Sequence, residues 1–312
     1  MMNKIPIVVI AGPTASGKTS VSISLAKEYD AEIVSADSMQ IYKGLDISTA
    51  KPTEEEKCGI PHHLMSFVEW GEKYSVAQYL SEARKVIADI HNRGKLPIIV
   101  GGTGLYISSL VDNIVFDDTS SNEEIRNRLT KEAKELGNEA MLKKLMEIDP
   151  ETAKTLHPNN LTRIIRAIEA YELSAKTKTK KKKQSREEES PYNACMIGLN
   201  FHDRQKLYDR INLRVDKMAE AGMVEEAYNA YKQGIGNTVC QAIGYKELIP
   251  YFEGKSTLPE CLEVLKQETR RYAKRQLTWF RRDERINWIY MDENLTEKNI
   301  IDNCKKYIAK CF

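Results

Sequence analysis

Short apolar runs alternate with longer amphipathic stretches over the first third of the chain. Residues 5–10, 31–35 and 96–100 are rich in Val and Ile, which is typical of buried strands. Residues 75–91 repeat apolar side chains every three or four positions, and this spacing predicts a helix with one buried face. Strands that alternate with loops and helices in this way predict an α/β fold built on a parallel sheet.

The pattern changes after Phe116. Three charged stretches of helical periodicity follow without a strand-like run among them: 122–136, 138–148 and 160–173. A strand pattern returns at 194–200, followed by two predicted helices and an edge strand: 204–221, 259–282 and 286–290. We therefore predict an all-helical insertion domain, 117–193, within a catalytic core formed by 1–116 and 194–312.

A glycine-bearing loop joins the first predicted strand to the first predicted helix. It matches the phosphate-binding pattern G-x-x-x-x-G-K-[ST] through Gly12, Pro13, Thr14, Ala15, Ser16, Gly17, Lys18 and Thr19. The glycines let backbone N–H groups surround an anion, and the helix adds its positive N-terminal end. Lys18 would supply a cation to phosphoryl oxygens, and the Thr19 hydroxyl a ligand to a phosphate-bound Mg²⁺. The loop predicts a P-loop NTPase-like, nucleotide-binding type of core that holds a di- or triphosphate.

Segments with polar side chains follow the next two predicted strands: Asp37, Ser38, Met39 and Gln40 after the second, and Thr103 after the third. Because parallel strands end at one edge of a sheet, these residues should lie beside the phosphate loop. Asp37 fits a general base or metal partner, and it also fits a helix N-cap. The turn 101–104 fits a close approach of the backbone to a ligand, and it also fits a tight strand-to-helix connection.

Basic residues gather on three predicted helices. Arg163 and Arg166 share one edge of their helix, which a solvated basic face would also explain. Arg210 and Arg214 lie four residues apart, where an arginine would stabilise charge on a departing phosphate. Residues 269–282 interleave cations with aromatic side chains, a pattern typical of nucleic-acid binding. The competing interpretation places Trp279 and Phe280 in the core and the cations outside.

The composition narrows the class of protein. Lys and Arg number 47 against 45 Asp and Glu, so the net charge of +2 does not by itself indicate a nucleic-acid partner. The six cysteines include no C-x-x-C pair, which disfavours a zinc knuckle or a disulfide framework. No apolar run approaches the ~20 residues of a membrane helix. A strand begins too near the N-terminus for a signal peptide to precede it. We expect a cytoplasmic monomer without membrane contact, in which the lysine-rich run 176–186 is a solvated loop.

In this combination and order, the motifs resemble those of the tRNA dimethylallyltransferase (tRNA isopentenyltransferase) family. The resemblance extends from residue 12 to about residue 280 and rests on seven stretches: 12–19, 37–42, 61–64, 101–106, 163–169, 241–247 and 272–276. It implies transfer of a dimethylallyl group from dimethylallyl diphosphate to N6 of adenosine 37 of tRNA, with release of diphosphate. The zinc-finger extension of eukaryotic relatives is missing, which points to the bacterial type.

The resemblance also implies roles for particular residues. Asp37 would take the N6 proton from a poorly nucleophilic adenine amine, Thr103 would orient the transferring group, and Gln40 would bond the flipped base. Lys18, Arg214 and Mg²⁺ would neutralise the departing diphosphate. Contacts to tRNA are implied for Asp37, Ser38, Met39, Gln40, Thr103, Thr162, Arg163, Ile164, Ile165, Arg166, Gln241, Ala242, Ile243, Gly244, Tyr245 and Lys246. At Thr162 the family often has Gln.

Three other functions stay open on the sequence. A P-loop kinase would bind ATP and transfer its phosphate, but it would need neither the helical insertion nor the basic helix. A relative that prenylates free adenine nucleotides would share the phosphate loop. An RNA-binding protein regulated by a nucleotide would bind without turnover.

Overall fold

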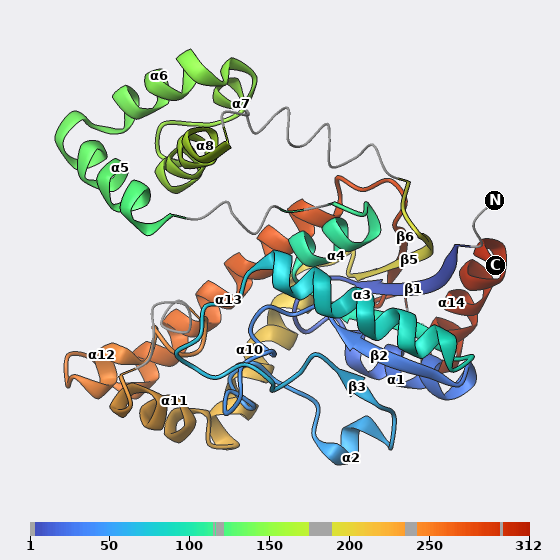
Figure 1. Cartoon of the computed structure of the whole chain (residues 1–312). Helices are drawn as coiled ribbons and strands as arrows, with labels where there is room; N and C mark the ends of the chain where they lie inside the picture. The colour runs from blue at the N-terminus through green and yellow to red at the C-terminus, as the bar shows by residue number, and fades with distance from the viewer. Residues whose placement is uncertain (1–3, 115, 117–121, 175–188, 235–241, 294–295) are drawn as a thin grey trace. The chain divides into compact units, whose positions relative to one another are not determined.

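The computed structural model describes residues 4–114, 116, 122–174, 189–234, 242–293 and 296–312 (Figure 1). They form two compact units, and the second interrupts the first. Residues 1–111 and 191–312 make the first unit, and residues 112–190 make the second. The insertion was predicted at 117–193. The lysine-rich run 176–186 lies outside the described residues.

A six-stranded sheet organises the first unit: β1 (Ile5–Ala11), β2 (Ala31–Ser35), β3 (His62–His63), β4 (Leu96–Gly101), β5 (Tyr192–Asn200) and β6 (Asn287–Tyr290). The order across the sheet is β3-β2-β4-β1-β5-β6, and each neighbouring pair is parallel. All six strands therefore end at the same edge, where ligands of such sheets bind. The predicted parallel α/β fold is confirmed, with β6 at the edge of the sheet.

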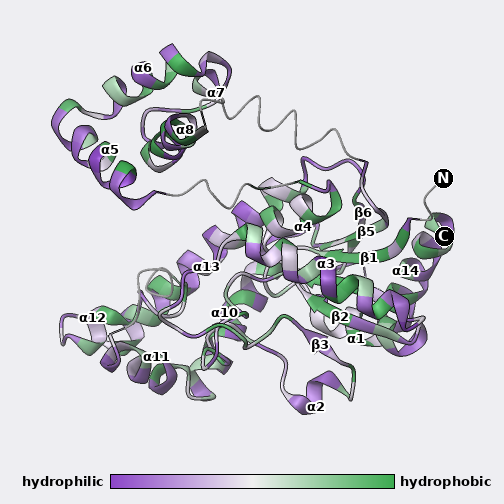
Figure 2. Ribbon diagram, in the orientation of Figure 1, coloured by the Kyte–Doolittle hydropathy of each residue, from purple (hydrophilic) through white to green (hydrophobic). Residues whose placement is uncertain are grey.

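Nine named helices belong to the described part of this unit: α1 (Lys18–Glu28), α2 (Glu54–Lys57), α3 (Val76–Asn92), α4 (Gly104–Val111), α10 (Arg204–Glu220), α11 (Met223–Lys232), α12 (Ile249–Phe252), α13 (Leu258–Phe280) and α14 (Glu297–Cys311). On one face of the sheet, Val8 and Ile10 share a hydrophobic cluster with α1 and α14. Ile7 and Val9 point to the other face and are equally buried, so both faces are covered. Figure 2 shows this arrangement as apolar strands between helices with polar outer surfaces.

The helices α10 to α13 extend this unit beyond the sheet. Their cluster includes Met223, Tyr245 and Leu265, so the N-terminal half of α13 packs against α11 and the loop before α12. The C-terminal half of α13 instead packs Ala273 and Leu277 into a cluster with Ala15 of the phosphate loop. A helix of 23 residues spans about 35 Å. One element thus reaches from the outlying helices to the edge of the sheet (Figure 1).

Helices are the only regular elements among the described residues of the second unit: α5 (Glu123–Leu136), α6 (Asn138–Ile148), α7 (Pro150–Lys154) and α8 (Leu161–Ser174). Its own core contains Leu129, Met141, Leu145 and Ile168. Pro150 occupies the first position of α7 behind the N-cap Asp149, where its missing N–H costs no hydrogen bond. No described helix of either unit combines the length and apolar character needed to cross a bilayer.

Candidate active site

The phosphate loop connects β1 to α1 as predicted. Gly12 has φ +149°, and a Cβ there would lie 2.5 Å from the backbone oxygen of Leu199, so no larger residue fits. Gly17 has φ +94° and precedes α1, whose first turn has no side-chain cap. Backbone N–H groups at this helix end remain for an anion, as phosphate binding requires.

Lys18 begins α1 and folds back onto the loop. Its Nζ donates to the backbone oxygens of Gly12 at 3.1 Å and Pro13 at 2.7 Å. Burial, followed by the charge of Arg214, lowers the pKa of Lys18 to about 7, although Asp37 opposes the shift. A diphosphate placed on this loop would restore the charge of the ammonium group, because an anion favours the protonated form.

Asp37 lies in the turn after β2. Its Oδ1 accepts hydrogen bonds from the backbone N–H groups of Met39 at 2.9 Å and Gln40 at 3.4 Å. Among the described residues, no hydrogen bond to its Oδ2 is recorded. The carboxylate raises the pKa of both Lys18 and Arg214, so it belongs to the same electrostatic cluster. The two interpretations of Asp37 are thus compatible, since one oxygen caps the turn and the other is available to a ligand.

Arg210 and Arg214 reach the site from α10, one helical turn apart. Arg210 donates from Nε to the backbone oxygen of Ala15 at 2.9 Å and lies over the ring of Phe201, so it supports the loop. Burial lowers the pKa of Arg214, while the charges of Asp37 and Glu56 raise it. Within the described residues no hydrogen bond or ion pair of Arg214 is recorded. A largely buried guanidinium in this position favours an anionic ligand.

Thr103 joins the second glycine turn to the turn after β2. Its Oγ1 accepts a hydrogen bond from the Ser38 N–H at 3.0 Å and lies 3.3 Å from the Ser38 hydroxyl. The structure therefore brings Thr103 and the Asp37 turn together, as the strand ends predicted. Gln40 differs from its predicted role, because its amide bonds inward to Ser35, Thr49 and Ala50. A bond from Gln40 to adenine would have to displace these internal ones.

The second glycine turn lies closely against helix α13. A Cβ at Gly102 would lie 2.1 Å from Nε2 of Gln276, and one at Gly104 would lie 2.3 Å from the Trp279 ring. Both partners belong to α13, so neither interpretation of residues 101–104 anticipated the reason for the glycines. Trp279 is 37% exposed while Phe280 is buried, so the core interpretation holds only for Phe280.

The predicted tRNA contacts on α8 divide by helix face. Thr162, Arg163 and Arg166 are exposed, as a binding surface needs. Ile164 and Ile165 are 0% and 5% exposed and belong to the core of the second unit. Their predicted contacts are wrong for the side chains, because the periodicity of 3.6 residues per turn directs these positions inward.

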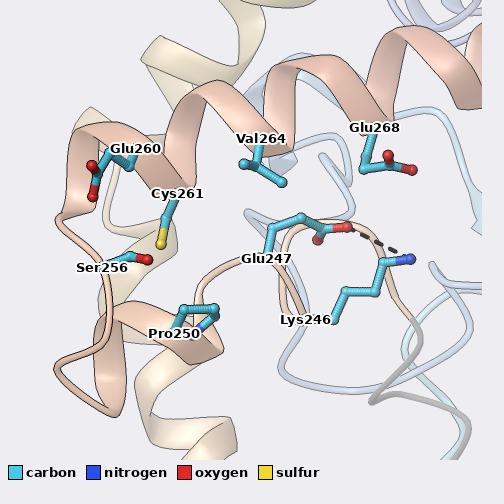
Figure 3. Close-up of a pocket in the computed structure, with 8 residues that line it drawn as sticks. All are labelled: Lys246, Glu247, Pro250, Ser256, Glu260, Cys261, Val264 and Glu268. Carbon is cyan, nitrogen blue, oxygen red and sulfur yellow. Dashed lines mark ion pairs between the residues drawn. The ribbon is translucent and has the colours of Figure 1, made fainter.

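The predicted contacts at 241–246 meet a similar correction. Gln241 lies outside the described residues, Ile243 is half-buried, and Ala242, Gly244 and Tyr245 are buried beneath α13. Lys246 is accessible, but its Nζ lies 3.7 Å from Glu247. It lines a cavity of about 340 Å³ together with Glu247, Pro250, Ser256, Glu260, Cys261, Val264 and Glu268 (Figure 3). Three carboxylates around this cavity disfavour an RNA phosphate there.

Thr19 fits a ligand for phosphate-bound Mg²⁺. It is exposed at the start of α1, and no hydrogen bond of its hydroxyl is recorded among the described residues. The described part of the chain contains no group of three His, Cys, Asp or Glu side chains arranged to hold a metal ion. Mg²⁺ bound through one side chain, waters and the substrate's phosphates does not need such a group.

Comparison with known proteins gives a consistent family. Residues 40–283 match the family described as IPP transferase, and residues 5–64 match the one described as isopentenyl transferase. The tRNA dimethylallyltransferase of Caldanaerobacter subterraneus is 48% identical over 308 residues, 98% of each chain. That of Acetivibrio thermocellus is 50% identical over 305 residues, 97% of each chain. The chain belongs to the tRNA dimethylallyltransferase family.

Solved structures of this family share the fold. The tRNA isopentenylpyrophosphate transferase of Bacillus halodurans aligns with a TM-score of 0.72 at 42% identity, covering 99% of this chain and 98% of that one. A eukaryotic dimethylallyltransferase acting on tRNA aligns with a TM-score of 0.84 at 30% identity, covering 98% of this chain and 80% of that one. The family resemblance found in the motifs is confirmed.

Proposed function

We propose that this chain transfers a dimethylallyl group from dimethylallyl diphosphate to N6 of adenosine 37 of tRNA and releases diphosphate. Beyond membership of the family, one observation in the structure supports this reaction. A phosphate loop with two nearby cations, Lys18 and Arg214, shares its electrostatic cluster with Asp37, whose Oδ2 is available. A leaving-group site beside a base is what alkylation of an amine requires.

The cations act on the departing diphosphate. Negative charge grows on the diphosphate as the bond to the allylic carbon breaks, and Lys18 and Arg214 stabilise that charge. The uncapped N–H groups at the start of α1 add to this. Mg²⁺ held by Thr19 and the phosphates would supply further Lewis-acid stabilisation.

Asp37 acts on the nucleophile. The lone pair of the adenine amine is delocalised into the ring, so the proton on N6 must leave as the new bond forms. Oδ2 of Asp37 accepts that proton while Oδ1 keeps its hydrogen bonds to the turn. Thr103, bonded to Ser38 of this turn, orients the transferring group. An adenosine in an anticodon loop must be flipped out of its stack to reach such a site.

Exposed cations on two elements support recognition of tRNA. Arg163 and Arg166 are exposed on α8, and Lys274, Arg281 and Arg282 are exposed on α13 or directly after it. Cations arranged along helices suit the phosphate backbone of a stem-loop. We further propose that the enzyme works in the cytoplasm as a monomer, because one chain supplies both the phosphate loop and the base.

One assay separates the proposal from its alternatives. The protein is incubated with Mg²⁺ and labelled dimethylallyl diphosphate, with unmodified tRNA or with AMP, and separately with ATP. Label in the adenosine beside the anticodon supports the proposal, and label in AMP would assign the chain to nucleotide prenylation. Loss of the γ-phosphate to an acceptor would indicate a kinase, and binding without turnover would indicate a regulator.

A further inference from the structure

Gln276 on α13 connects the two glycine-bearing loops of the site. Its Oε1 accepts a hydrogen bond from the backbone N–H of Thr14 at 2.9 Å, and its Nε2 donates to the backbone oxygen of Gly102 at 3.0 Å. The side chain is 6% exposed, the bond to Gly102 is buried and the bond from Thr14 is partly buried. Thr14 belongs to the phosphate loop and Gly102 follows β4, so one amide joins loops 88 residues apart in the sequence.

Glutamine suits this position because it presents one donor and one acceptor at a fixed separation. A side-chain amide is neutral, and its oxygen accepts from an N–H while its separate nitrogen donates to a C=O. Loss of either bond would leave a backbone group of an active-site loop buried without a partner, which is unfavourable. The contact at Gly102 has no spare room, since a Cβ there would lie 2.1 Å from Nε2.

A second side chain of α13 continues the connection. Tyr272 lies one helical turn before Gln276, and burial raises the pKa of its phenol while the nearby side chains of Thr103 and Gln276 lower it. Thr103 in turn holds the backbone of Ser38, next to Asp37. Gln276 thus bonds to the phosphate loop at Thr14 and to Gly102, and the next residue, Thr103, bonds to the turn that carries the base.

We propose that Gln276 is a positioning residue that sets the separation between the phosphate loop and the Asp37 turn. It acts through Thr14 on the grip of the diphosphate, and through Gly102 and the adjacent Thr103 on the placement of the base. The proposal rests on the proposed function, in which the departing diphosphate and the N6 proton must be held at one distance from each other.

Two substitutions test the role of Gln276. Gln276→Met keeps the length of the side chain and removes both hydrogen bonds. Gln276→Glu keeps an acceptor for Thr14 but loses the donor to Gly102 and adds a negative charge near the diphosphate. The matched control is Gln205→Met on α10, where the exposed amide bonds only to Asp209. Binding of inorganic diphosphate is measured by calorimetry, and prenylation of an anticodon stem-loop gives kcat and KM.

For Gln276→Met we expect diphosphate affinity and kcat each to fall about tenfold or more, with stem-loop affinity within about twofold of the parent. For Gln276→Glu we expect a larger loss at neutral pH that is partly reversed below about pH 6, because the protonated carboxyl can again donate. A variant whose fold is merely loosened would show no such recovery, relative to the parent, as the pH falls. Combined with Tyr272→Phe, the effect of Gln276→Met on kcat should be less than additive.

The proposal is overturned if folded Gln276 variants keep the parent's diphosphate affinity and kcat. It is also overturned if affinity for both substrates falls in parallel with the melting temperature. Should Gln276→Met fail to fold, Gln276→Glu and its pH dependence decide the question. Should the parent leave tRNA unprenylated, the proposed function fails, yet the comparison of diphosphate affinities still tests the link to Thr14.

Discussion

Burial and neighbouring charges shift the pKa of two cationic side chains of the site, Lys18 and Arg214. Burial and the charge of Arg214 disfavour the protonated form of Lys18, whereas the charge of Asp37 favours it. The net effect lowers the pKa of Lys18 to about 7. The pKa of Arg214 is lowered by burial and raised by Asp37, but an arginine stays protonated at any ordinary pH. Lys18 is therefore the cation of this group whose charge depends on conditions near neutrality.

We predict that the affinity for diphosphate decreases above pH 7. The lysine of the free protein loses its proton there, so the anion must bind together with a proton, and Kd should rise by up to about tenfold per pH unit. Calorimetry in buffers of different ionisation enthalpy measures this uptake. Lys18→Met should bind weakly and keep only the pH dependence of the ligand itself. Exposed Lys27→Met is the control, and equal pH profiles for it and Lys18→Met would contradict the prediction.

We predict that Asp37→Asn abolishes transfer and leaves tRNA affinity nearly unchanged. The asparagine oxygen can replace Oδ1 as acceptor for Met39 and Gln40, so the turn is kept, but the amide cannot take a proton. A loss of at least about a hundredfold in kcat is expected from single-turnover prenylation. Asp37→Ala would also remove the cap of the turn and is the less specific variant. Normal turnover of Asp37→Asn would exclude this residue as the base.

At the scale of elements, the edge of the sheet contains a charged cluster that stabilises the fold. Glu32 of β2 accepts from two nitrogens of Arg93, at 2.5 and 2.7 Å, and lies 2.8 Å from Nε2 of His63 on β3. Hydrogen bonds from Arg93, and less so from His63, lower the pKa of Glu32 to about 2 although burial opposes them. His63 therefore helps to attach the two-residue edge strand β3 to β2.

We predict that Glu32→Gln destabilises the first unit by about 2 kcal/mol at pH 7. The depressed pKa of Glu32 means that its contribution is complete above the unfolded value of about 4.3 and is lost as the pH falls towards 2. The difference in the free energy of unfolding between Glu32→Gln and the parent, measured by urea unfolding, should thus be about half as large at pH 3 as at pH 7. Glu82→Gln removes an exposed pair with Lys85 and is the control. A stability difference that does not change with pH would contradict the assignment of this stabilisation to the ionised form of Glu32.

Helix α8 supplies another prediction at this scale. Arg163 is exposed on a helix whose opposite face is buried, so its removal should spare the fold. Arg163→Ala should weaken tRNA binding and reduce the slope of log Kd against log salt by about 1, because one phosphate contact is lost. Exposed Lys143→Ala on α6 is the matched control. An unchanged salt slope would mean that this edge of α8 does not touch RNA.

At the scale of the whole molecule, each unit has its own hydrophobic core, which indicates that the two units are stabilised independently of each other. Among the described residues, the buried core of the second unit is made of side chains from α5, α6, α7 and α8, and Arg126 pairs there with the buried Glu169. The core of the first unit joins segments on both sides of the insertion, since β1 pairs with β5. The first unit can therefore form without the second.

We predict that replacing residues 112–190 with a flexible linker of about 15 residues yields a folded first unit. It should bind diphosphate within about threefold of the parent, because the phosphate loop, α10 and α13 all belong to this unit. Transfer to tRNA should be lost, since the exposed arginines of α8 are removed. Circular dichroism and calorimetry check the fold and the affinity. Loss of diphosphate binding in a folded deletion variant would contradict the independence of the units.

Much of the fold followed from local patterns. Strands β1, β2, β4, β5 and β6 and the helices α3, α5, α6, α8, α10 and α13 lie within a few residues of their predicted positions. The short strand β3 and the C-terminal helix α14 were not predicted. β3 has only two residues, too few for a periodic signal. The sequence of α14 carries such a signal, since Ile300, Ile301, Cys304 and Ile308 form its buried face.

The sequence by itself determined the phosphate loop, the strand ends that carry Asp37 and Thr103, and the helical nature of the insertion, because these depend on residues adjacent in the chain. Only the tertiary structure decided which side chains face the site. Ile164 turned inward, Gln40 bonded internally, and Gln276 joined two loops that are distant in sequence. A buried glutamine on the apolar stripe of α13 was the available signal for that link. Its partners are backbone groups, which every residue carries, so no sequence pattern could name them.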